Sequence, residues 1–301
     1  MSSKPPPRWL PFLVLGLGVL IISFGAILAR LAQTHGLPSL AIAALRLGLA
    51  TLVISPIALW QSRCALLNIT RRQIGLALGA GFFLALHFAT WISSLEYTSI
   101  ASSTALVTTN LLWIGIASFF LFGDKPGKIM FGGIVVSLLG SLLIFWSDSR
   151  DSAPGSNPMF GNFLALVGSW CFSAYLLIGR RLRADLPLPA YVWLAYGGAA
   201  LFLLLACALS GVPLSGYAIP AYWAALGMAL GLQLLGHSAY NWSLKHVSPT
   251  FVAVVTLGEP VGSAIMAWLF FGESFAHLQG TGFVMLLAGI YLAAVGESRR
   301  R

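Results

Sequence analysis

Leu121-Phe122-Gly123-Asp124 is repeated 149 residues later in the chain as Phe270-Phe271-Gly272-Glu273. Coincident leucines are common in an apolar chain, but a tetrapeptide of this kind rarely recurs by chance. The same shift brings further residues into register on both sides of it: Leu37-Pro38 with Leu186-Pro187, Gly48 with Gly197, Ser94-Leu95 with Ser243-Leu244, Ser99 with Ser248, Gly133 with Gly282 and Gly140 with Gly289. The sequence therefore predicts two copies of one unit.

The residues around these repeated positions are mostly apolar. Of the 301 residues, 58% are hydrophobic and only 8% are charged, whereas a soluble domain has about 25% charged residues. Because so few charges cannot cover a surface in water, we expect the chain to lie in lipid. Apolar runs bounded by Gly, Pro, Ser or charge predict ten transmembrane helices, at about 10–32, 38–60, 73–96, 101–122, 127–147, 158–180, 187–209, 220–244, 249–271 and 276–297.

Each copy of the unit contains five predicted helices. Five is an odd number, so the second copy must cross the bilayer in the opposite sense to the first. Inverted repeats recur in secondary transporters, where two similar halves move about a site near the membrane midplane. We therefore expect an all-α membrane protein with ten transmembrane helices in two inverted five-helix repeats. The repeats are predicted at residues 1–148 and 158–301, with a polar linker at 149–157 on the outer side.

The positions of the basic residues predict the orientation, because cytoplasmic loops carry an excess of Lys and Arg. With the N-terminus placed inside, all of the 17 Lys and Arg residues fall on the cytoplasmic side except Arg30, Arg46 and Arg150. The opposite orientation would invert this bias. Both termini are therefore predicted to be cytoplasmic, which requires an even number of spans.

Several other function classes leave no pattern in the sequence. The basic residues form no aromatic-interleaved patch, so no nucleic-acid partner is expected. Cys64, Cys171 and Cys207 have no CxxC or metal-ligand spacing, so neither a disulfide nor a metal site is expected. There is no HExxH, GxSxG, Walker A or complete GxGxxG, so we predict no enzyme activity and no cofactor. The energy for transport would come from an ion gradient or from the substrate's own gradient.

Two charged residues fall deep within predicted spans. Arg46 lies about eight residues, or roughly 12 Å, into its helix, and Glu259 lies about ten residues, or roughly 15 Å, into its own. A charge at the bilayer centre costs roughly 2.5–3.5 kcal/mol on insertion scales, so each requires a reason. They are predicted to bind a substrate or handle a proton, with Arg46 binding a carboxylate. The alternative is a buried Arg–Glu pair that holds helices together.

Other polar residues lie at corresponding positions of the two repeats. Asn110 occupies the repeat position of Glu259, which supports a cavity between the halves. His87 and His237 lie one position from repeat equivalence, and Trp91 and Asn241 follow them by four residues on the same helix face. Histidine titrates near neutrality and could relay a proton. Hydrogen bonding between helices is the alternative role for these side chains.

Aromatic residues beside these polar positions could line a pocket for an amphipathic organic solute. The candidates for such a pocket are Trp91, Trp113, Trp170, Tyr175 and Trp242. The alternative for each is ordinary packing against the core or against lipid.

The segment from Asn110 to Gly140, and still more Leu257-Gly258-Glu259-Pro260 through Leu269 to Glu273, resembles the drug/metabolite transporter superfamily in its EamA-repeat group. Arg46 and Ser169-Trp170 are similar to the same pattern. The chain departs from it at Phe24, where many relatives have Trp, and at Asn110-Leu111, which replaces the Glu-Pro of the second half.

This resemblance implies ten helices, cytoplasmic termini, a central cavity and export of small metabolites across the bacterial inner membrane. Members similar to this chain export amino acids or amino-acid-derived compounds, including metallophores. We therefore expect a small zwitterionic substrate, the lipid bilayer as the surrounding partner, and protons as a candidate coupling ion. A broad extruder of drugs or lipophilic cations is the alternative, and an intramembrane enzyme or a non-transporting sensor is the alternative from another class.

Overall fold

The computed structural model describes residues 7, 9–98, 100–123, 125–148, 157–271 and 277–299. Some of the predictions concern residues outside these ranges. These are Lys4, Arg8, Ser99, Asp124, Arg150, Gly272-Glu273, Arg300, Arg301 and linker residues 149–156.

The described residues form helices joined by short connections, with no strand among them. The helices of the first half are α1 (Leu10–Ile22), α2 (Gly25–Thr34), α3 (Ser39–Gln61), α4 (Arg63–Leu67), α5 (Arg71–Tyr97), α6 (Ile100–Val107), α7 (Asn110–Phe122) and α8 (Lys128–Asp148). Those of the second half are α9 (Pro158–Asp185), α10 (Leu188–Leu209), α11 (Ile219–Gly227), the π-helix η1 (Met228–His237), α12 (Ser238–Ser243), α13 (Pro249–Thr256), α14 (Glu259–Phe271) and α15 (His277–Ser298).

Seven helical stretches of the described chain are long and apolar enough to cross a membrane. They are Leu10–Thr34, Ser39–Gln61, Arg71–Tyr97, Met159–Asp185, Leu188–Leu209, Ile219–Ser243 and Gly280–Ser298. Two shorter apolar helices, Asn110–Phe122 and Lys128–Gly140, lie between them in the chain. The chain is thus a multi-pass helical protein, as its composition predicts.

The helix boundaries follow the same 149-residue shift that relates the two halves of the sequence. Shifted by 149 residues, α6 coincides with α13 and α7 coincides with α14. The shifted range of α3 likewise falls on α10, and that of α8 falls on α15, each within one residue. The two halves are therefore structural repeats of one another.

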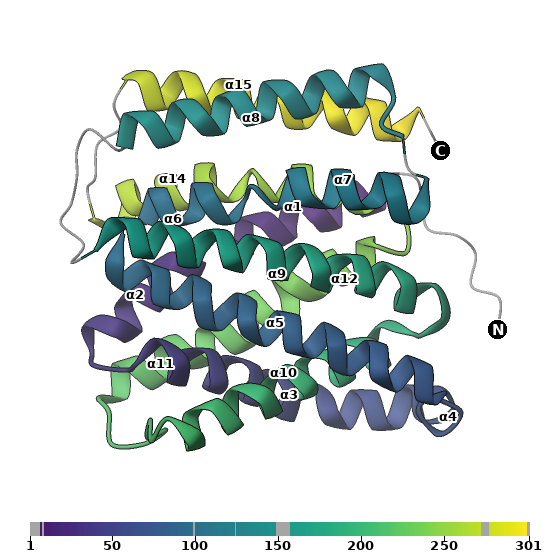
Figure 1. Cartoon of the computed structure of the whole chain (residues 1–301), viewed down its shortest axis with the longest axis vertical. Helices are drawn as coiled ribbons and strands as arrows, with labels where there is room; N and C mark the ends of the chain where they lie inside the picture. The colour runs from purple at the N-terminus through teal and green to yellow at the C-terminus, as the bar shows by residue number, and fades with distance from the viewer. Residues whose placement is uncertain are drawn as a thin grey trace.

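The helices lie roughly parallel in a bundle in which equivalent helices of the two halves pack together (Figure 1). α3 packs against α10, and α8 packs against α15 as the outermost pair at one end of the long axis. α5 packs against α9, and η1 packs against α1. The repeat shift relates η1 to part of α5 and α1 to part of α9. The beginning of α1 and the end of α15 lie on the same side of the bundle, at the right in Figure 1.

One side chain of α2 and one of α9 each donate to a backbone carbonyl near the C-terminal end of a neighbouring helix, α5 and α12 respectively. In the first half, Gln33 Nε2 donates to the carbonyl of Ile92 at 2.9 Å. In the second half, Arg183 Nε donates to the carbonyl of Asn241 at 3.1 Å. Ile92 and Asn241 are repeat equivalents, so the two halves make this contact at corresponding positions.

Three predicted helices are interrupted instead of continuous. The run at 10–32 is divided between α1 and α2 at Ser23-Phe24. The runs at 101–122 and 249–271 are each divided as well, at Thr108-Thr109 and at Leu257-Gly258. A hydroxyl group bonds back to its own helix at each interruption, which bends helices. Ser23, Thr108 and Thr256 donate to the carbonyls of Val19, Thr104 and Ala253 at 2.8, 3.0 and 2.7 Å.

Candidate substrate site

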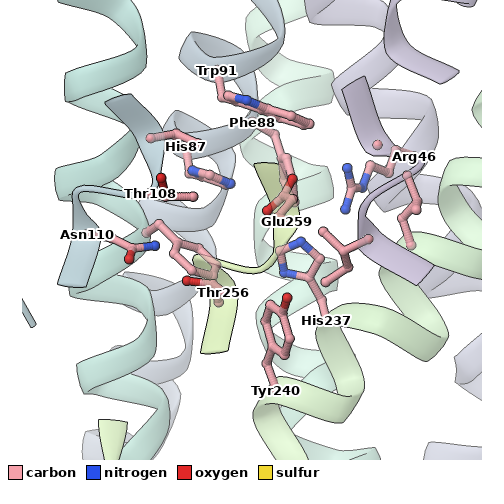
Figure 2. A pocket seen from close by; sticks show the side chains of 15 residues that line it. Arg46, His87, Phe88, Trp91, Thr108, Asn110, His237, Tyr240, Thr256 and Glu259 are labelled. Atoms are coloured by element: carbon pink, nitrogen blue, oxygen red, sulfur yellow. The ribbon is translucent and has the colours of Figure 1, made fainter. Parts of the chain in front are cut away.

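The three helix interruptions meet at one cavity between the halves (Figure 2). Residues on both sides of each interruption line this cavity: Ile22 and Gly25, Thr108 and Asn110, and Thr256 and Glu259. Pro260 lacks a backbone N–H, which removes one helical hydrogen bond at the third interruption. Interrupted helices are where transporters place substrate groups near the midplane.

The cavity is narrow. Its volume is about 30 Å³, which is room for one or two water molecules. Its polar lining comes from both halves and is buried: Arg46, His87, Trp91, Thr108, Asn110, His237, Tyr240, Thr256 and Glu259.

Arg46 reaches the cavity from α3 and is held on two sides. Its Nε donates to Gln233 Oε1 at 2.9 Å, and its guanidinium carbon lies 3.9 Å from the centre of the Phe88 ring. Only 1% of Arg46 is exposed, yet its Nη2 has no hydrogen-bond partner in the described structure. One nitrogen of a buried cation is therefore available to a ligand.

Glu259 is the first residue of α14 and lines the same cavity. Its carboxylate lies between Phe88 and His237 in the close view, with Arg46 beside it (Figure 2). Among the described residues, Arg46 and Glu259 do not form an ion pair within 4.0 Å. A cationic and an anionic side chain thus line the same small space without neutralising each other directly.

Several other buried polar atoms around the cavity lack a hydrogen-bond partner in the described part of the chain. They are Trp91 Nε1, Asn110 Oδ1, His237 Nδ1 and Tyr240 OH. Because most buried polar side-chain atoms have at least one partner, such a group requires an explanation. A concentration of unpaired donors and acceptors at one cavity is typical of a site that binds a polar solute or water.

The two histidines that line the cavity come from different halves of the chain, His87 from α5 and His237 from η1. His87 donates from Nδ1 to the carbonyl of Gly168 at 3.0 Å, and its ring is parallel to that of Trp91. The ring centres of His87 and His237 are 6.5 Å apart. Each histidine is buried among aromatic rings, so the site has a largely aromatic wall with a few polar atoms.

Six of the predicted site residues line this cavity: Arg46, His87, Trp91, Asn110, His237 and Glu259. Their role in binding a substrate stays a prediction. The other three lie elsewhere. Trp113 and Trp170 stack edge to face at 5.7 Å and are 39% and 45% exposed. Asn241 is fully buried one turn beyond His237 and donates to the hydroxyls of Tyr175 and Tyr196.

Helix register explains these differences. The buried face of α7 consists of Asn110, Leu111, Ile114 and Ser118, so Trp113 points away from the cavity. The same register could have identified two residues that the sequence analysis missed. Gln233 and Tyr240 lie four residues before and three after His237, on one helix face. Phe88 and Leu232 carry no polar signal, and only the packing reveals them.

Comparison with known proteins agrees with this architecture. The EamA-like transporter family matches residues 9–146 and 159–295. The threonine/homoserine exporter RhtA of Salmonella typhimurium is 28% identical over 99% of this chain and 94% of its own length. A probable amino-acid metabolite efflux pump of the same species is 24% identical over 96% of this chain and 93% of its own length.

A solved structure described only as a crystal structure of a protein has the same fold. It superposes with a TM-score of 0.78 at 16% identity, covering 98% of this chain and 100% of the other. The EamA-like family is part of the drug/metabolite transporter superfamily, and its bacterial members lie in the inner membrane. The family match covers both halves of the chain, so the protein belongs to the EamA-like transporter family and is a multi-pass protein of the inner membrane.

Proposed function

We propose that this protein exports an amino acid, or a small zwitterion derived from one, by alternating access. The carrying observation is that Arg46 and Glu259 line one cavity without pairing with each other. A zwitterion has one group for each: its carboxylate for Arg46 Nη2 and its ammonium for Glu259. Aromatic rings such as Phe88 and Trp91 would contact the apolar part between these groups.

The transport cycle requires the cavity to change size. A volume of about 30 Å³ is too small for an amino acid, so loading must separate the walls. The interrupted helices are suited to this movement, because the parts on either side of a break can tilt independently. The relatives RhtA and the probable efflux pump are named for export, which supports the outward direction.

The proposal includes ten membrane crossings with both termini in the cytoplasm. It is supported by the common side of the bundle on which α1 begins and α15 ends (Figure 1). α4, with the basic residue Arg63, lies on that same side. An excess of basic residues favours the cytoplasmic side.

Transport assays with purified protein in liposomes test the proposed site. Arg46→Ala and Glu259→Ala should each reduce efflux of L-threonine by roughly 10- to 100-fold, because a hydrogen bond to a charged group is worth about 1.5–3 kcal/mol. Arg63→Ala removes an exposed arginine far from the cavity and serves as the matched control. Threonine transport that survives both cavity substitutions would contradict the proposed roles.

The same variants separate the zwitterion exporter from a broad extruder of lipophilic cations. The contacts of Arg46 with Gln233 and Phe88 would suit a purely structural arginine, which is what the extruder requires. In that case a lipophilic cation would be transported, Glu259→Ala would abolish its transport, and Arg46→Ala would leave it intact.

A further inference from the structure

The second half contains a π-helix where the first half has an ordinary α-helix. η1 spans Met228–His237, whereas the equivalent residues 79–88 lie within the continuous helix α5. Ser238 N–H donates to the carbonyl of Gln233 five residues earlier, as a π-turn requires. The hydroxyls of Tyr196 and Ser238 also donate to that carbonyl, each at 3.3 Å. The wide turn is therefore stabilised at Gln233.

This turn brings the Gln233 side chain against Arg46. Gln233 is fully buried, and its Oε1 accepts the hydrogen bond from Arg46 Nε at 2.9 Å. Phe88 covers one face of the guanidinium. The arginine is thus fixed by one neutral acceptor and one aromatic ring, while its Nη2 has no partner in the described structure. A carboxylate in place of the amide would fix the arginine equally well but would neutralise it.

Neither residue of this pair has a counterpart in the other half of the repeat. Arg46 corresponds to Ala195, and Gln233 corresponds to Leu84. All four of these residues are buried, so the difference between the halves is one of chemistry, not of exposure. The cation and its neutral acceptor therefore depart together from the symmetry of the two halves.

We propose that Gln233 is a positioning residue that makes the site specific for a carboxylate, by holding Arg46 in place without neutralising it. This inference rests on the proposed zwitterion transport and names the residue that selects one end of the substrate. With Gln233 neutral, the charges of Arg46 and Glu259 balance, as do those of an amino acid. With an acid at position 233, the site would carry a net negative charge and select an amine without a carboxylate.

The test compares L-threonine with 1-aminopropan-2-ol, the amine that remains when its carboxyl group is removed. Binding of each to purified full-length protein in detergent is measured by calorimetry. The wild type should bind threonine more tightly than the amine. Gln233→Glu should reverse that order, because the new carboxylate pairs with Arg46. The side chains have nearly the same shape, and elution as a single folded species verifies that the variant retains the fold.

A second variant separates positioning from charge. Gln233→Met removes the acceptor but adds no charge, so Arg46 loses its fixed orientation. It should raise the KM for threonine efflux roughly tenfold with the maximal rate little changed. Gln33→Glu and Gln33→Met are matched controls, because Gln33 is hydrogen-bonded to Ser39 and Ile92, whereas Gln233 is hydrogen-bonded to Arg46. Both controls should keep the wild-type order of the two ligands.

The outcomes distinguish this inference from the proposed function. If the wild type prefers threonine and Arg46→Ala loses that preference while Gln233→Glu keeps it, Gln233 has no positioning role. If Arg46→Ala also keeps the preference, the proposed role of Arg46 fails, and the inference fails with it. Reversal by Gln233→Glu together with unchanged order in both Gln33 controls supports the positioning role.

Discussion

Ser248 connects the start of α13 to α15 by hydrogen bonds to Glu297. Its backbone N–H donates to Glu297 Oε1 at 2.8 Å, and its hydroxyl donates to Glu297 Oε2 at 2.9 Å. The same hydroxyl accepts from the backbone N–H of Phe251 at 3.1 Å and so caps the start of α13. Both Ser248 and Glu297 are buried. The N-cap of one half-helix is therefore fixed to α15.

We expect Ser248→Ala to destabilise the protein by more than the loss of an ordinary N-cap would. Loss of a serine N-cap costs about 1 kcal/mol, and the buried Glu297 carboxylate would also lose one of its two bonds. Thr70→Ala is the matched control, because Thr70 caps α5 with Gln73 in an exposed capping box and has no such partner. Thermal unfolding in detergent should show a larger decrease in Tm for Ser248→Ala. Equal decreases would mean that the contact with Glu297 adds nothing.

At the scale of single residues, polar groups could be predicted from the sequence because lipid makes them expensive. Arg46, Glu259 and Asn110 are conspicuous within apolar runs, and all three line the cavity. Aromatic residues carry no such signal, because a ring is equally acceptable in the core and against lipid. The sequence therefore could not show that Trp91 lines the cavity and that Trp113 does not.

At the scale of helices, α8 and α15 pack so closely that their backbones are in contact. A Cβ atom built on Gly133 would lie 2.6 Å from the backbone nitrogen of Ala293 and from the backbone oxygen of Gly289. One on Gly140 would lie 2.7 Å from the backbone of Gly282 and Leu286. These glycines are matched by the repeat shift, which explains why they recur in the sequence: each permits the other helix to approach.

Two adjacent glycines of α8 provide a sharp test of this contact. Gly133→Ala should destabilise the protein by about 1–3 kcal/mol or separate the two helices, because the nearest neighbours of the new Cβ atom are backbone atoms that cannot rotate away. Gly132→Ala has no atom within 4 Å of its new Cβ and should be neutral or slightly stabilising, since alanine favours helix. Thermal unfolding of both variants in detergent distinguishes them. A Gly133→Ala variant as stable as Gly132→Ala would contradict the close contact.

The approximate positions of the helices could be predicted from apolar runs, but their internal breaks could not. Hydropathy does not respond to a hydroxyl that bonds back to its own helix, so it gives no sign of the interruption at Ser23-Phe24. A proline can kink a helix, and α14 begins at the residue before Pro260. The π-helix and the short helix α4 left no pattern that apolar periodicity detects.

At the scale of the whole molecule, the repeat could be predicted because it depends on many positions at once. The shift of 149 residues aligns helix boundaries as well as single residues. The site depends instead on positions where the two halves differ. A single sequence does not show which of its many differences between the repeats matter. Arg46 opposite Ala195 could be noticed as a charge, whereas Gln233 opposite Leu84 acquired meaning only from its contact with Arg46.

The small volume of the cavity predicts how efflux depends on the opposite side of the membrane. Because the cavity without substrate has room for only one or two water molecules, we expect the empty protein to complete the transport cycle. Liposomes loaded with labelled L-threonine should therefore release it into plain buffer nearly as fast as into buffer with unlabelled threonine. Release that requires threonine outside would show that the empty form cannot return.

A carrier that completes its cycle while empty has a different role in a cell from an obligate exchanger. It can discharge a surplus without importing an equal amount of anything else, so the internal pool can fall. Under the proposed export, the small volume lined by Arg46 and Glu259 would therefore permit net release of the substrate.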